Sequence, residues 1–234
     1  MTAPALIKDL QLGRAPRVAG TIITENYLRD WSAQPRPLPC DLVELRVDGF
    51  SHVNGWLEIG ARIEAAGTPV FATVRHAREG GQWAGDEEAR RQLLNSALEK
   101  LSGIDVELHS DLAPGLAERA RALNKLCILS FHDFQKTAPR AELLAILKQM
   151  QQLGSVAKIA ATANSLDDVE TLRSLLHEPW TVPVCLIGMG AHGRATRLSF
   201  PKEGSCLTYG YLDIAGAPGQ FSAQELRDHF NPVR

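Results

Sequence analysis

The sequence lacks the features that would mark a membrane, secreted or nucleic-acid-binding protein. None of its apolar runs approaches the roughly 18 residues that a membrane-spanning helix needs, and its first residues lack the charged-then-apolar pattern of a secretory signal. With 25 basic and 27 acidic residues, the formal charge of −2 provides no basic excess for nucleic acid or an acidic membrane. We therefore expect a cytoplasmic protein whose partners include neither a nucleic acid nor a membrane.

Cysteine is also scarce, and the four that occur are far apart in the chain. No C-x-x-C pair is present, and three of the four lie inside apolar runs. Thiols in such runs behave as small buried hydrophobic residues. We expect reduced core cysteines, not disulfides, at Cys40, Cys127, Cys185 and Cys206.

Eight short runs with the composition of β-strands alternate with helix-like segments. Such alternation argues for parallel βαβ units. The number of runs and the 234-residue length favour a (β/α)₈ barrel over a doubly wound open sheet. No linker-like stretch divides the chain, so we expect one domain over residues 1–234. The predicted strands are 17–23, 42–48, 69–75, 103–108, 126–132, 155–161, 183–189 and 206–212.

Capping residues mark the ends of several expected helices. Asp86 is an N-cap candidate before a periodic run of leucines that ends at Gly103. Ser165 precedes another helix, and Ser222 with Glu225 forms a capping-box pattern before the last one. The segment after the seventh strand, ATRLSF, has the weakest helical pattern.

Charged residues occupy one face of the second predicted strand, LVELRVD. Side chains alternate across a strand, so its apolar residues share one face and its charged residues the other. The charged face consists of Glu44, Arg46 and Asp48. A strand inside a barrel should be apolar on both faces, and a site at the carboxyl-terminal mouth is the usual cause of a departure. The pattern predicts either such a site or a structural ion network that fills the barrel.

Polar residues also share a face near the ends of four later strands. They are Thr73, Arg75, Asp105, Glu107, Ser130, His132 and Lys158. Because the parallel strands of a barrel end at the same rim, side chains at those ends converge. We expect Arg46, Arg75, His132 and Lys158 to lie near one mouth.

Lys158 is the residue that fits its surroundings least, because it interrupts the apolar run SVAKIAA. An unpaired buried charge is costly. An amine in a partly desolvated cavity beside other cations gives up its proton more readily, and a neutral amine can form a Schiff base with a ketone. The alternative is a structural lysine whose head pairs with Glu44 or Glu107. A Schiff-base reaction also needs a proton shuttle. His132 could be that shuttle, and the alternative is a packed histidine with no part in the chemistry.

Two loops near the end of the chain have binding patterns. GMGAHG (188–193) fits a dinucleotide loop only weakly, because it follows the seventh strand and precedes no convincing long helix. Arginines after it are better suited to a carboxylate. APGQ (217–220) is either a mobile turn that presents Gln220 or a plain Pro-Gly turn.

Six segments match one family in the right order: ELRVD (44–48), RHAREGG (75–81), SFHDF (130–134), KIA (158–160), MGAHGRATR (189–197) and APGQ (217–220). The chain resembles type I 3-dehydroquinate dehydratase, the Schiff-base enzyme of the shikimate and quinate pathways. The resemblance extends from about residue 17 to residue 230. It implies a (β/α)₈ barrel, commonly a homodimer, that dehydrates the small molecule 3-dehydroquinate with no metal and no cofactor.

The resemblance also implies roles for individual residues. Lys158 aligns with the imine-forming nucleophile, His132 with the general acid and base, and Glu79 with the acid that orients the histidine. The implied substrate contacts are Glu44, Arg46, Arg75, Arg197, Gln220, Met189, Tyr209 and Ala217. One departure affects the loop after the eighth strand, where Gly216 replaces the usual serine and its substrate-binding hydroxyl.

Two other functions stay open at this level. Another lysine Schiff-base barrel, such as an aldolase, would cleave a carbon–carbon bond, but the Glu44–Arg46–Asp48 strand and the REGG segment argue against it. A ligand sensor of the quinate pathway would bind substrate without chemistry, and Gly216 mildly favours it. The presence of both Lys158 and His132 argues for the enzyme.

Overall fold

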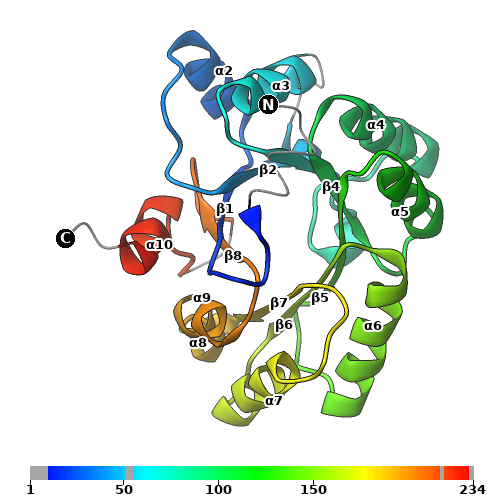
Figure 1. The fold of residues 1–234 in the computed structure, drawn as a ribbon, viewed down its shortest axis with the longest axis vertical. Coiled ribbons are helices and arrows are strands. Elements are labelled where there is room, and N and C mark those ends of the chain that lie inside the picture. Colours follow the sequence, from blue (N-terminus) through cyan, green and yellow to red (C-terminus); the bar gives the residue numbers. More distant parts are fainter. Residues whose placement is uncertain (1–9, 51–54, 217–218, 232–234) are drawn as a thin grey trace.

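Eight parallel strands form the centre of the molecule, as Figure 1 shows. The computed structural model describes residues 10–50, 55–216 and 219–231. Strands and helices alternate along the chain, so each strand runs in the same direction as its neighbours. The strands are β1 (Val18–Ile22), β2 (Leu42–Arg46), β3 (Val70–Thr73), β4 (Gly103–Glu107), β5 (Leu126–Asp133), β6 (Val156–Thr162), β7 (Val184–Met189) and β8 (Thr208–Tyr211).

The strands follow one another around a nearly closed ring. The order is β7-β6-β5-β4-β3-β2-β1-β8, so consecutive strands from β1 to β7 pair with one another and β1 also pairs with β8. Between β7 and the chain entering β8, the main-chain N–H of Cys206 donates to the carbonyl of Val184 at 2.8 Å. The described residues thus form one (β/α)₈ barrel, as the sequence predicts.

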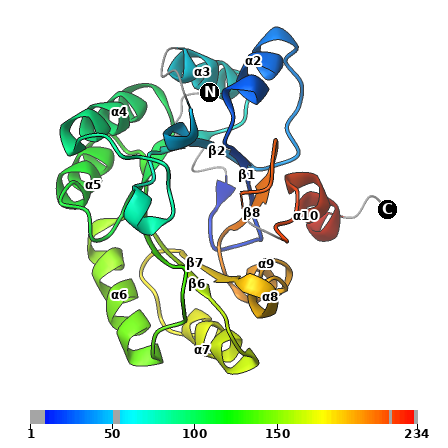
Figure 2. The ribbon, with the colours of Figure 1, turned by 180° about the vertical axis from the view of Figure 1, so that it is seen from behind.

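Helices surround the strands in Figures 1 and 2, and their caps follow the sequence signals. The Asp86 side chain accepts from the N–H of Ala89, and both capping boxes form, at Ser165 and at Ser222. None of the helices in the described ranges is long and apolar enough to cross a membrane. They are α2 (Glu25–Ala33), α3 (Trp56–Ala65), α4 (Glu87–Lys100), α5 (Ala113–Ala122), α6 (Arg140–Leu153), α7 (Leu166–Leu176), α8 (Gly190–Gly193), α9 (Thr196–Ser199) and α10 (Ala223–Phe230), with 3₁₀ turns η1 (Val47–Gly49), η2 (Ala77–Glu79) and η3 (Phe200–Glu203).

Two hydrophobic cores lie on opposite faces of the strands. The larger one packs the outer faces against the helices and includes Val43, Leu45 and Ile159. The smaller one fills the barrel and includes Leu42, Phe71 and Val156. The segment before β1 crosses the amino-terminal end of the barrel, in dark blue in Figure 1, and adds Leu10 to this inner core. That end is therefore closed, and the carboxyl-terminal end is left for a site.

Several predicted strand boundaries are wrong by one or two residues. The third predicted strand, 69–75, is Val70–Thr73, and the eighth, 206–212, is Thr208–Tyr211. The sequence pattern extends the second strand to Asp48, but β2 ends at Arg46 and the chain continues into η1. The guanidinium of Arg46 donates to both Asp48 carboxylate oxygens, at 2.9 and 2.8 Å. Asp48 therefore belongs to a turn that folds back on the strand end, and not to the strand itself.

Candidate active site

A cavity of about 130 Å³ opens at the carboxyl-terminal ends of the strands. Every residue to which the family resemblance assigns a role lines it, except Ala217, which lies outside the described residues. The structure confirms that four predicted side chains converge at this mouth: Arg46, Arg75, His132 and Lys158. The lining residues are Thr21, Ile23, Glu44, Arg46, Arg75, Glu79, Gly80, His132, Phe134, Lys158, Ala160, Ile187, Met189, Arg197, Tyr209, Gly216 and Gln220.

A larger hollow of about 420 Å³ lies elsewhere, where the chain enters β2 and β3. Residues 35–38 and 66–68 line it, together with Trp31 and Arg227. None of the candidate residues borders this hollow, so the smaller cavity is the candidate active site.

Lys158 points into the barrel from β6 and is 4% exposed. Its Nζ lies 2.9 Å from Asp105 Oδ2 and 4.5 Å from the centre of the Tyr209 ring. The amine is therefore paired, as the structural-lysine alternative predicted, but its partner is Asp105 and not Glu44 or Glu107. Strand register alone does not explain the contact, because it aligns Lys158 with Ser130 on β5 and Ser130 with Glu107 on β4, whereas Asp105 aligns with Ile128. Strands in a barrel are tilted and staggered, so residues in register do not lie at the same height along its axis.

Asp105 is the acid that pairs with two of the cations of the cavity, Arg75 and Lys158. Its Oδ1 accepts from Arg75 Nη2 and from the Ser130 hydroxyl, each at 2.6 Å. Burial would raise the pKa of this carboxyl, but Arg75 and Lys158 oppose burial and hold it below the usual range. Asp105 is therefore a carboxylate that neutralises positive charge beside Lys158.

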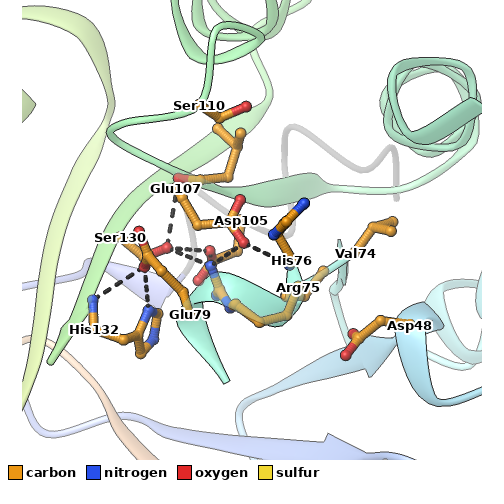
Figure 3. Close-up of polar contacts among 12 residues, drawn as sticks. Asp48, Val74, Arg75, His76, Glu79, Asp105, Glu107, Ser110, Ser130 and His132 are labelled. Atoms are coloured by element: carbon orange, nitrogen blue, oxygen red, sulfur yellow. Dashed lines mark hydrogen bonds and ion pairs between the residues drawn. The ribbon is translucent and has the colours of Figure 1, made fainter. Parts of the chain in front are cut away.

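His132 is held by Glu79, which η2 carries (Figure 3). Glu79 Oε2 lies 2.9 Å from His132 Nδ1 and accepts from the His132 main-chain N–H at 3.0 Å. Nδ1 is thus engaged, which leaves Nε2 as the nitrogen available to a ligand. Burial lowers the pKa of His132 well below its usual value, with Arg75 and Lys158 adding to the effect, and burial raises the pKa of Glu79 to about 7.

Glu44 and Arg46 line the cavity from β2 with different partners. Glu44 accepts from the hydroxyls of Thr21, at 3.0 Å, and Thr73, at 2.7 Å. Arg46 is held by Asp48, whose carboxylate also accepts from the main-chain N–H of Gln82 at 3.1 Å. Both side chains are fixed from behind, so their remaining polar atoms are preorganised for a ligand.

Arg197, from α9, differs from the other cations of the cavity. It donates to the Tyr209 carbonyl at 3.0 Å, and no carboxylate in the described ranges pairs with it. Burial lowers the pKa of its guanidinium. Arg194 lies outside the cavity, where it stacks 4.0 Å from the centre of the Phe221 ring and donates to the Gly219 carbonyl. An anion in the cavity would therefore find one guanidinium without an acidic partner.

The remaining candidates form the wall and the rim. The Tyr209 ring packs edge-on against Phe71, with centroids 6.5 Å apart. Met189 ends β7 beside it. Gln220 Oε1 accepts from the main-chain N–H of Gly216 at 2.9 Å. A side chain at Gly216 would meet Ile23 Cδ1 at 3.0 Å, so Ile23 takes up space that a serine there would need.

The sequence analysis missed Asp105 and Phe134 as members of the site. Strand alternation already placed Asp105 on the inner face, but alternation cannot say which of several acids reaches the lysine. Phe134 follows β5, is 53% exposed and stacks on His132 with centroids 6.3 Å apart. Gly80 permits this, because a Cβ there would lie 2.3 Å from the Phe134 ring.

Comparison with known proteins agrees with this geometry. The type I 3-dehydroquinase family model matches residues 24–232. The chain is 33% identical to 3-dehydroquinate dehydratase of Enterococcus faecalis, across 97% of this chain and 96% of that protein. A solved structure of the enzyme from Enterococcus faecalis has a TM-score of 0.82 at 29% identity, covering 95% of this chain and 96% of that one. One of type I 3-dehydroquinate dehydratase from Clostridium difficile, with covalently modified comenic acid, has a TM-score of 0.84 at 25% identity, covering 94% and 93%. The chain belongs to the type I 3-dehydroquinase family.

Proposed function

We propose that this protein removes water from 3-dehydroquinate to give 3-dehydroshikimate through an imine on Lys158. One observation carries the proposal: a lysine, a histidine held by a carboxylate and an arginine with no acidic partner among the described residues line one cavity. These side chains suit the ketone of the substrate, the proton beside that ketone, and the carboxylate. Family membership supports the same assignment.

The first step is imine formation at Lys158. Its Nζ pairs with Asp105 in the free protein, and its proton passes to His132 Nε2 before the amine attacks. The neutral amine adds to the ketone carbon, and the carbinolamine hydroxyl takes the proton back from His132 and leaves as water, which gives a protonated imine. The positive charge then lies beside the Asp105 carboxylate, which stabilises it in a buried setting.

Proton transfer by His132 follows. The imine acidifies the neighbouring C–H, and Nε2 removes that proton while Nδ1 stays bonded to Glu79. The resulting enamine expels the hydroxyl group, which takes the proton from the imidazolium and leaves as water. Hydrolysis of the conjugated imine then consumes the water released at imine formation, frees Lys158 and leaves a net loss of one water.

Binding uses the groups around this pair. Arg197 holds the substrate carboxylate as a bidentate ion pair. Glu44 and Arg46 bind the ring hydroxyls, and Arg75 supports the site through Asp105. The apolar wall and the rim are Met189, Tyr209 and Gln220, and Ala217 is proposed as a further rim contact.

Two measurements on purified protein test the proposal. Addition of 3-dehydroquinate should produce the absorbance of a conjugated enone, and borohydride added with substrate should fix a covalent adduct that peptide mapping places on Lys158. Borohydride without substrate is the control. An adduct on another lysine, or binding of substrate without any enone, would overturn the assignment, and the second result would point to the sensor.

Arg197→Ala tests the carboxylate contact. Because the variant leaves the substrate carboxylate unpaired, we expect KM to rise about tenfold or more while kcat changes less. Arg194→Ala is the matched control, since Arg194 lies outside the cavity. Equal KM values for the two variants would contradict the proposed role of Arg197.

We also propose a cytoplasmic homodimer, on the basis of the family resemblance. The four cysteines are buried and free, which fits a reducing compartment. Sedimentation of the purified protein tests the oligomeric state.

A further inference from the structure

We propose that Glu107, held by Arg90, is a positioning residue for the reaction: it fixes the chain that carries Glu79 and balances the charge of Arg75. The inference deepens the proposed function and rests on it. Neither Glu107 nor Arg90 lines the cavity, so both would act through residues that do. Figure 3 shows Glu107 together with Arg75, Asp105 and Ser130.

Glu107 ties three groups together at the end of β4, where it is 3% exposed. Its Oε1 accepts from the main-chain N–H of His76 at 3.0 Å and lies 3.1 Å from Arg75 Nη1. Its Oε2 pairs with Arg90 Nη2. A buried carboxylate with three charged or main-chain donors is a rigid anchor, because each donor limits its movement.

Arg90 reaches this carboxylate from α4 and is 1% exposed. Its Nε donates to the carbonyl of Val74 at 2.8 Å, and its Nη1 contacts Glu87 at 3.0 Å. One side chain therefore connects the helix layer, the residue after β3 and the anchor on β4. A surface helix rarely buries an arginine, and here the burial serves a connection toward the cavity.

The segment anchored by Glu107 carries Glu79. Trp83 N–H donates to the Arg75 carbonyl at 3.1 Å and Ala77 N–H to the Trp83 carbonyl at 3.2 Å, so residues 75–83 form a closed turn. Within it, the N–H groups of Glu79 and Gly81 donate to the His76 carbonyl. The His76 N–H bond to Glu107 thus fixes the base of the turn whose tip places Glu79 against His132.

The same contacts form a row of alternating charges. From the cavity outward they are Lys158, Asp105, Arg75, Glu107, Arg90 and the half-exposed Glu87. Removing one member leaves its neighbour with an unbalanced charge, which acts on the titrating pair Glu79 and His132. The groups facing that pair from the other elements are Arg46, Arg75, Asp105 and Lys158.

The two partners can be told apart by the sign of their effect. Glu107→Gln removes a negative charge, so nearby pKa values fall and the pH profile of kcat/KM should move to lower pH by about 0.5 unit. Arg90→Met removes a positive charge and should move the profile to higher pH by about the same amount. The double variant should lie between them. A merely structural role predicts no such opposed shifts.

Several outcomes would overturn the inference: single variants whose profiles coincide with that of the wild type, or shifts in the same direction. If the single variants do not fold because each leaves a buried charge unpaired, the double variant decides. We expect its kcat to fall about tenfold or more with a smaller change in KM, because the turn loses its anchor, and wild-type kcat would refute the role. Wild-type protein without enone formation would instead refute the proposed function.

Discussion

The two ends of the barrel interior are built from the same strands but from opposite kinds of side chain. On β2, Leu42 is fully buried in the inner core and Glu44 lines the cavity. On β6, Val156 and Lys158 repeat the change. Each pair is two residues apart on the same face of its strand, about 7 Å along it. On each of these two strands, the inner face therefore changes from an apolar core residue to a charged cavity residue within two positions.

The difference lies in how the two ends are stabilised. The lower end, at the amino-terminal side of the strands, is stabilised by the removal of apolar surface from water, at about 25 cal/mol per Å². The upper end, at the carboxyl-terminal side, contains buried charges that must be paired. Asp105 pairs with both Arg75 and Lys158 there. Arg197 has no carboxylate partner in the described residues, so the charged layer is balanced except where a substrate carboxylate would bind.

The largest expected effect comes from replacing Lys158 with an apolar side chain like those at the amino-terminal end of the barrel. Lys158→Met should reduce turnover by about 10⁴-fold or more, because no other lysine among the described residues lines the cavity. The variant should still fold cooperatively, since Asp105 keeps Arg75 and Ser130. Enone formation and thermal unfolding measure the two effects. Residual turnover above one part in a hundred would break the assignment.

Removing the proton shuttle should have the next largest effect. His132→Ala should lower kcat by about 10²- to 10⁴-fold, the usual contribution of general acid and base catalysis. Imine formation should persist at a reduced rate, because the Lys158 amine and the Asp105 carboxylate that stabilises the protonated imine are both still present. Borohydride trapping with mass spectrometry separates the two steps. Turnover at the wild-type rate would remove His132 from the mechanism.

A substitution at the lower end should have the reverse signature. Leu42→Ala opens a cavity in the inner core and should lower the free energy of unfolding by about 2–5 kcal/mol. Folded protein should keep kcat/KM within about threefold, since Glu44 retains the hydroxyls of Thr21 and Thr73. Leu42→Met, which nearly conserves volume, is the control and should lose less than about 1.5 kcal/mol. Catalytic loss in the soluble, folded variant would show that the two ends are coupled.

The sequence predicts the barrel well because its signals are local. Alternation in LVELRVD separates Leu45, against the helices, from Glu44, in the cavity, and the capping residues fix helix starts. It is harder to predict from the sequence which side chains pair across different strands. Even strand register does not identify the partner of Lys158, because it aligns Lys158 with Ser130 and Glu107, whereas Nζ pairs with Asp105. The pattern offered Glu44 and Glu107 because it does not show how tilted strands bring side chains together.

Candidate residues supplied by the family resemblance line the cavity, apart from Ala217 outside the described residues. Their supporting contacts do not follow from the resemblance. The stacking of Phe134 on His132 requires the space above Gly80, and the turn at Asp48 arises from its pairing with Arg46. Such contacts depend on side-chain packing among segments far apart in the chain. A motif records which residues occur, and only the fold shows which of them touch.

The smallest expected effect concerns the pH dependence of the upper end. Burial raises the pKa of Glu79 to about 7, so this carboxyl is protonated at pH 6 and ionised at pH 8. Because the ionised form is the better acceptor for His132 Nδ1–H, kcat/KM should rise by about tenfold as pH increases through 7. The pKa of His132 itself is lowered, so the imidazole stays neutral in this range and does not cause the inflection.

Glu79→Gln distinguishes this carboxyl from other titrating groups. The amide cannot ionise, yet its oxygen can still accept from the main-chain N–H of His132, as Glu79 does. The inflection near pH 7 should disappear in the variant, while kcat/KM at pH 6 stays within about tenfold of the wild type. A Leu42→Met profile serves as the comparison from the lower end and should retain the inflection. If Glu79→Gln also retained it, the group that limits the rate would lie outside the pair of Glu79 and His132, and the charged layer would not be the part of the barrel that sets the pH response.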